Sequence, residues 1–150
     1  MRQLLEQTLK GNTDAVDLCM SVFEWANEYD HLIDGDALGK PPEQALHDAM
    51  WLMAVVIPAN PFYRRFYAEL SPLLASGIST WRVSIELQRD GDDHGLMLAH
   101  VLRWTLTEFF MYCALIVGGR DWADAAGPGF WRAMTQDHSF ATFVAKNKGA

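Results

Sequence analysis

Apolar residues recur every three or four positions along most of the chain, which is the spacing of amphipathic helices. Strict alternation of apolar and polar residues never persists, and turns of the Asn-Gly type are absent, so strands are not expected. Proline, glycine and capping residues separate the helical segments. The pattern predicts a short helix over residues 2–9 and five main helices over residues 13–34, 41–57, 60–70, 71–88 and 94–117, followed by short ones near 121–126, 129–135 and 138–146.

Single residues are expected to set the helix ends. Asn12 or Thr13 caps the helix 13–34, since both side chains can accept a hydrogen bond from the first turn. Asp93 caps the helix that follows it in the same way. Ser71-Pro72 either starts a new helix or kinks a continuous one. Gly127-Pro128-Gly129 is expected to separate two of the short C-terminal helices.

The number and length of these segments define the fold class. Five main helices joined by short connections predict an all-α, antiparallel helical bundle that carries short C-terminal helices. The 150 residues fit one domain, residues 1–150, with one core. Half of the residues are hydrophobic and 12% are aromatic, which excludes the composition of a disordered chain.

The net charge and the cysteines indicate which kinds of partner the protein binds and in which cellular compartment it acts. The net charge of -7 disfavours nucleic acid as a partner. Cys19 and Cys113 lie in apolar segments and read as reduced core residues of a cytoplasmic protein. No secretory signal is visible at the N-terminus. The most apolar run, residues 109–117, is shorter than the ~20 residues of a membrane span, so we expect a buried core helix and no membrane partner.

The run Glu24–Asp36 concentrates the polar chemistry of the chain. It holds five carboxylates, an Asn and a His within thirteen residues. On a helical wheel, Asn27, Asp30 and Asp34 continue an apolar stripe, so a stripe that begins as core ends polar. The remaining polar residues of the helix lie on a more solvated arc: Glu24, Glu28 and His31.

A carboxylate that faces a core needs a partner, because burial of an isolated charge is costly. The helix 94–117 offers one, since His100, Arg103 and Thr107 fall on one polar stripe. We therefore expect Asp30 or Asp34 to contact Arg103, with His100 nearby.

Three interpretations of this cluster stay open. In the first, Asp30, Asp34, His100 and Arg103 form a buried network that fixes the register of the helices. In the second, carboxylate and amide oxygens bind a divalent cation such as Mg²⁺; the candidate ligands are Asn27, Asp30, Asp34 and Asp36. In the third, Arg103 binds a small anion or metabolite, and His100 carries a proton.

His47-Asp48 is a second pair that could bind metal, as in the HD-type phosphohydrolases. The two residues flank an apolar face rather than interrupt it. That face consists of Leu46, Met50, Met53 and Ile57. A solvated helix surface is therefore the favoured interpretation of His47 and Asp48.

The strings DHLIDGD, PANPFYRRF, AHVLRW and CALIVGG span most of the chain. Together they resemble a group of small helical proteins encoded by tailed phages and prophages. The resemblance implies a phage-encoded protein that acts in the host cytoplasm or is built into the virion. It implies no activity and no catalytic residue.

The sequence leaves two functions from different classes. The apolar, Trp-rich composition exceeds what one small core can hide, which favours a non-enzymatic interaction or structural protein of phage type. Its expected partner is a second copy of the chain or another phage or host protein. The alternative is a metal-dependent enzyme acting on a phosphate ester, with a divalent cation as cofactor. Its candidate catalytic residues are Asp30, Asp34, His100 and Arg103.

Overall fold

The computed structural model describes residues 1–34, 40–136 and 138–148. It is 87% helical, and the described residues contain no strand, so the predicted all-α class is confirmed. Backbone contacts divide the chain into two compact units, Met1–Tyr67 and Ala68–Ala150. The assignment of residues 1–150 to one domain stays a prediction.

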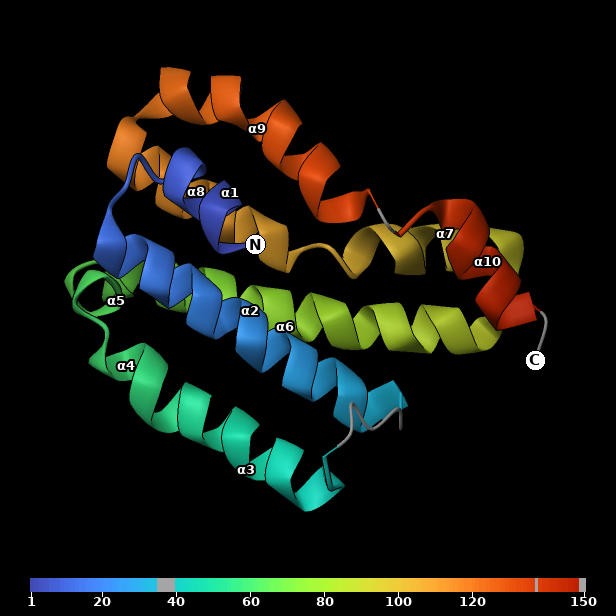
Figure 1. The fold of residues 1–150 in the computed structure, drawn as a ribbon. Helices are drawn as coiled ribbons and strands as arrows, with labels where there is room; N and C mark the ends of the chain where they lie inside the picture. Colours follow the sequence, from blue (N-terminus) through green and yellow to red (C-terminus); the bar gives the residue numbers. More distant parts are fainter. Residues whose placement is uncertain (35–39, 137, 149–150) are drawn as a thin grey trace. The chain divides into compact units, whose positions relative to one another are not determined.

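The first unit is built around one long helix (Figure 1). Its elements are α1 (Arg2–Thr8), α2 (Thr13–Asp34), α3 (Pro42–Trp51), the π-helix η1 (Leu52–Val56), α4 (Ile57–Ala59) and α5 (Pro61–Arg65). The helix α3 packs alongside α2. The core of this unit is apolar and includes Leu5, Leu9, Val16, Leu18, Cys19, Val22, Trp25, Ile57 and Phe62.

Two asparagines begin helices in this unit. The Asn12 Oδ1 accepts a hydrogen bond from the Ala15 N–H at 3.0 Å, which makes Asn12 rather than Thr13 the capping side chain of α2. The Asn60 Oδ1 accepts one from the Tyr63 N–H at 3.0 Å and so caps α5. Pro42 and Pro61 occupy the first helical positions of α3 and α5, where a missing N–H costs nothing.

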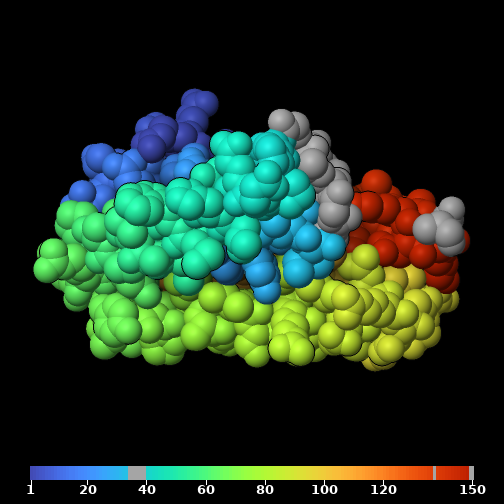
Figure 2. All heavy atoms as spheres, turned by 90° about the horizontal axis from the view of Figure 1, so that it is seen from below, coloured from blue at the N-terminus to red at the C-terminus, as the bar shows by residue number. Residues whose placement is uncertain are grey.

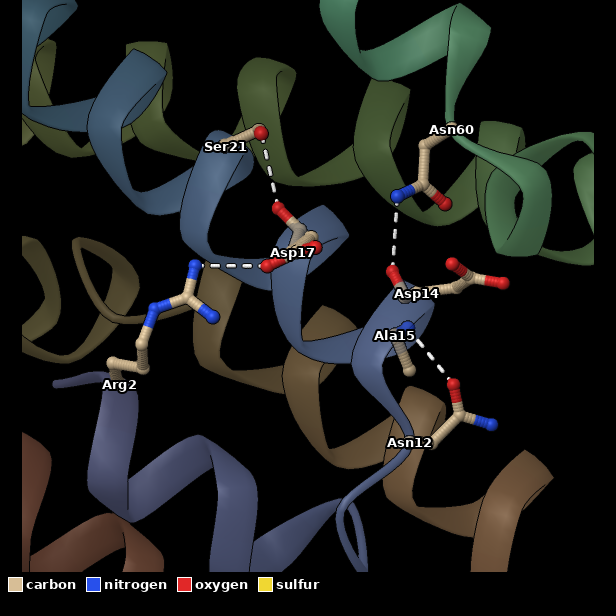
Figure 3. Close-up of polar contacts among 7 residues, drawn as sticks. All are labelled: Arg2, Asn12, Asp14, Ala15, Asp17, Ser21 and Asn60. Carbon is tan, nitrogen blue, oxygen red and sulfur yellow. Dashed lines mark hydrogen bonds and ion pairs between the residues drawn. The ribbon is translucent and has the colours of Figure 1, made fainter.

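Side chains also tie neighbouring elements to the first turns of α2 (Figure 3). The Asn60 Nδ2 donates to the carbonyl oxygen of Asp14 at 2.9 Å, so one side chain both caps α5 and binds α2. Arg2 of α1 pairs with the Asp17 carboxylate at 2.8 Å. These contacts fix both the start of α1 and the start of α5 against α2.

The π-helix has a local cause in Pro58. Proline lacks an N–H and its ring crowds the carbonyl four residues earlier, which is that of Ala54. In η1 the Ile57 N–H instead bonds the Leu52 carbonyl five residues back, which widens the helix just ahead of the proline. The helical path therefore continues from Pro42 to Ala59 without a break.

The second unit holds α6 (Tyr67–Asp90, which starts at the last residue of the first unit), α7 (Asp93–Leu102), α8 (Leu106–Gly118), α9 (Arg120–Thr135) and α10 (Phe140–Lys148). The helix α9 folds back along α8, and α10 packs on α7 (Figure 1). Pro72 lies inside α6, so no new helix starts at Ser71. The predicted helix 60–70 is wrong, because a turn at Phe66 separates α5 from α6.

One predicted helix is two helices in the structure. The segment 94–117 is interrupted by turns at residues 103–105, which separate α7 from α8. Asp92, not the predicted Asp93, caps α7, because its Oδ1 accepts from the Gly95 N–H at 2.8 Å. The register of the helix start thus lies one residue earlier than predicted.

The opposite error occurs at Gly127-Pro128-Gly129, where the sequence predicted a break. The helix α9 runs through all three residues. Its Phe130 is buried with 1% exposure and packs edge-on against Phe110 of α8. Packing against α8 outweighs the poor local propensity for helix, which amounts to a few kcal/mol.

The stretch Asp93–Gly118 is the one part of the described chain that is long and apolar enough, by length and composition, to cross a membrane. In its most apolar window, 28% of the residues are buried. Phe109, Phe110, Cys113 and Ala114 of α8 belong to the core. A core helix of a soluble protein passes the same test, so the absence of a membrane partner stays a prediction.

Candidate functional site

The acidic C-terminal end of α2 is only partly within the described residues. Asn27 is exposed and Asp30 is half-buried. Asp34 is the last residue of α2, but its side chain and the whole of Asp36 lie outside the described part. The cation site that the sequence placed on these four residues therefore stays a prediction.

Glu28 contradicts the expectation of a solvated side chain. It is only 17% exposed and forms an ion pair with Lys40, which also contacts the Asp48 Oδ2 at 3.1 Å. Lys40 thus joins the end of α2 to α3, where it bridges two carboxylates. The hydrogen bond that Lys40 donates to Glu28, helped by the one to Asp48, holds the pKa of Lys40 above its ordinary value of 10.5 against the opposing effect of desolvation. Burial of Glu28 is possible because Lys40 compensates its charge.

Lys40 was not among the residues predicted for a site. It lies twelve residues beyond Glu28, so helical spacing gives no sign of their contact. The only signal in the sequence is its place as a lone cation between the acidic run and Pro41. Asp48 was expected on a solvated surface with His47. His47 is 75% exposed, as expected, whereas the Asp48 side chain is half-buried and paired.

His100 and Arg103 lie together in the second unit, as their spacing predicted, but the surroundings that the structure describes are aromatic. The His100 Nε2 is 3.0 Å from the carbonyl oxygen of His138. The ring of His100 contacts Phe140 and Phe143 of α10. The Arg103 guanidinium lies over the rings of Trp81 and Phe143, at 6.0 and 5.6 Å from their centroids, in cation–π geometry.

This group attaches the C-terminal helix to α6 and α7. At the far end of α10, the Asn147 Oδ1 accepts from the Gln88 Nε2 at 2.6 Å, and Lys148 pairs with Asp93. No residue of α10 is buried. Ring contacts and polar ties at its two ends therefore hold a short helix that would be marginal alone.

The predicted contact between Asp30 or Asp34 and Arg103 joins residues of different units. Asp30 belongs to Met1–Tyr67 and Arg103 to Ala68–Ala150, so this contact stays a prediction. Thr107, the third member of the predicted stripe, is buried on α8 beyond the turns at 103–105. Within the described ranges, no group of three or more His, Cys, Asp or Glu side chains gathers as metal ligands do.

The helix α3 carries the most unusual surface of the first unit. The sequence placed Leu46 and Met50 on the apolar face of this helix, and such a face usually packs on the core. In the structure the buried residues of α3 are instead Ala45 and Ala49. The helix therefore turns its small residues inward, where they let it pack closely on α2, and its large residues outward.

Four large apolar side chains line this outer face. Leu46, Met50, Trp51 and Val55 are 51%, 63%, 55% and 40% exposed, respectively. Leu46 and Met50 are four residues apart, as are Trp51 and Val55, a spacing that places the members of each pair side by side on a helix. We call these four residues the outer face of α3–η1; Figure 2 shows the atoms of this segment, teal to green, on the surface turned toward the viewer.

No protein-family model, curated protein or solved structure matches this chain. The resemblance to phage-encoded helical proteins therefore stays an interpretation of the sequence.

Proposed function

We propose that the chain is a non-enzymatic helical interaction protein that associates with itself through the outer face of α3–η1. The observation that carries this proposal is the inverted amphipathicity of α3. Its alanines face α2, while Leu46, Met50 and Trp51 face outward. A monomer gains nothing by keeping side chains of this size in water, whereas a partner helix would bury them.

The surroundings of the face suit reversible binding. Polar residues border it, since Glu43, Gln44 and His47 are all exposed on the same helix. An apolar centre within a polar rim is the usual arrangement of interfaces between soluble proteins. His47 stacks on Trp51, which orients the indole ring before a partner arrives. The resemblance to phage-encoded proteins would place such a partner in the host cytoplasm or the virion.

Light scattering after size-exclusion chromatography tests the proposal. The monomer has a mass of 16.9 kDa, and we expect the measured mass to rise toward twice that value between about 1 and 200 µM, the range in which small interfaces associate. Met50→Glu places a charge in the centre of the face and should keep the protein monomeric. Val83→Glu is the matched control, because Val83 is also a large apolar residue, 48% exposed on α6, and belongs to the other unit of the chain.

Two results would count against the proposal. The wild type could stay monomeric throughout this range, or Val83→Glu could abolish association as fully as Met50→Glu. A monomeric wild type together with a strong loss of stability in Met50→Glu would mean that the face is covered within the same chain.

A further inference from the structure

We infer that two copies pair antiparallel along the outer face of α3–η1, about a two-fold axis near Leu52 and Met53, with opposite charges meeting at both ends. This inference rests on the proposed function and adds the orientation and the register. A two-fold interface applies one surface patch to itself, so the patch must be complementary to its own rotated copy.

The distribution of large and small residues meets that condition. An axis between Leu52 and Met53 places Trp51 of one copy opposite Ala54 of the other, since both positions are exposed and equidistant from the axis. The same axis places Leu46 opposite the exposed Ala59. It also places Met50 opposite Val55. Trp51 and Leu46 thus each meet an alanine, which lets the two helices approach closely, while Met50 packs on Val55.

The charges at the two ends also fit an antiparallel pair. Glu43 is exposed at the start of α3, and Arg64 and Arg65 are exposed on α5, beyond the other end of the face. An antiparallel arrangement brings Glu43 of each copy toward the arginines of the other. A parallel arrangement would instead place Glu43 against Glu43 and arginine against arginine, which is repulsive.

The available area indicates a weak, concentration-dependent pair. An aromatic side chain offers roughly 150–250 Å², so the exposed part of Trp51 contributes roughly 100 Å². The other three residues contribute roughly 50 Å² each on the scale of 60–120 Å² per aliphatic side chain. Two copies together bury about 500 Å² of apolar surface, which corresponds to a total interface at the low end of specific complexes. Because the apolar area is small, the charged residues at the rim contribute measurably to which register the two copies adopt.

Charge-reversal variants and their mixture test the arrangement by sedimentation velocity. In Glu43→Lys, and likewise in the double variant Arg64→Glu with Arg65→Glu, both ends of a homodimer become repulsive. We expect each to associate about three- to thirtyfold more weakly than the wild type, because each end contributes on the scale of an exposed ion pair. Mixed together, the two proteins restore opposite charges at both ends, so the mixture should form a heterodimer about as tightly as the wild type.

Glu24→Lys is the matched control, since it makes the same charge change on an exposed residue of α2 and should leave association unchanged. Two outcomes overturn the antiparallel register while leaving self-association intact. One is that the reversals have no effect although Met50→Glu still prevents dimer formation; the other is that the mixture associates no better than its components. A wild type that never dimerises removes both the register and the proposed function.

Discussion

Asn60 combines two roles whose contributions can be separated by substitution. Its Oδ1 accepts from the Tyr63 N–H at 3.0 Å to cap α5, and its Nδ2 donates to the Asp14 carbonyl at 2.9 Å. Loss of a cap costs about 0.5–2 kcal/mol. Loss of one further hydrogen bond costs about 0.5–1.5 kcal/mol, with the lower value applying here because this contact is exposed. Asn60→Ala should therefore lower the free energy of unfolding by about 1–2.5 kcal/mol.

Asn60→Asp separates the two roles. Aspartate caps helices as well as asparagine does, but it has no N–H to offer the Asp14 carbonyl. We expect this variant to lose only about 0.5–1 kcal/mol, the share of the lost hydrogen bond. Asn12→Ala is the matched comparison, because it removes a cap of the same kind, that of α2.

Urea unfolding followed by circular dichroism measures these differences. In a thermal scan, Asn60→Ala should lower the Tm by about 2–10 °C, given about 2–4 °C per kcal/mol for a chain of this size. If Asn60→Ala unfolds at the same urea concentration as the wild type, neither hydrogen bond of Asn60 stabilises the fold. If Asn60→Asp loses as much stability as Asn60→Ala, the cap contributes nothing.

Three further predictions follow from the contacts described. The pKa of Lys40 is raised in the folded state, so its ion pairs contribute stability that is fully present below pH 10.5 and is lost as the pH rises through the folded pKa. In urea unfolding, the wild type should therefore be more stable than Lys40→Met at about pH 9. At about pH 11.5 the difference in unfolding free energy between the two proteins should be smaller. Phe143→Ala removes the ring that contacts both His100 and Arg103, so hydrogen exchange should accelerate over residues 140–148 while α8 stays protected; unchanged exchange there would contradict the attachment of α10 through its rings. Phe130→Ala should cost about 3–5 kcal/mol in urea unfolding because Phe130 is buried against Phe110, whereas a loss below about 1 kcal/mol would show that α9 is not held by this packing.

Helix ends that depend on neighbouring residues could be predicted from the sequence. Caps and prolines act within three or four residues, so the predicted helix starts at residues 13, 41 and 60 agree with the structure to within one residue. Gly127-Pro128-Gly129 was misread for the opposite reason. Burial of Phe130 on another helix keeps α9 continuous, and that contact is not local in the sequence.

The candidate site was predictable to a smaller extent. The spacing of His100 and Arg103 correctly placed them together, but the aromatic partners Trp81 and Phe143 come from two other helices. The solvated position of Glu28 was wrong because its partner Lys40 lies twelve residues further along the chain, where helical spacing gives no sign of the contact. The wheel of α3 has apolar residues on both sides, so hydrophobicity alone could not decide which side faces α2.

Side-chain size, rather than hydrophobicity, decides the orientation of α3. Close packing of two helices favours alanine at the contact, and Ala45 and Ala49 supply it. The larger residues are thereby left on the outer face, and the proposed self-association depends on their exposure.

Sedimentation equilibrium of the wild type beside Met50→Glu measures self-association through the outer face of α3–η1. For the wild type we expect a reversible equilibrium between the 16.9 kDa monomer and a dimer of twice that mass, with a dissociation constant of roughly 1–100 µM. For Met50→Glu we expect a monomer alone. Self-association through this face is ruled out if the wild type remains at 16.9 kDa over this range, or if Met50→Glu dimerises as strongly as the wild type.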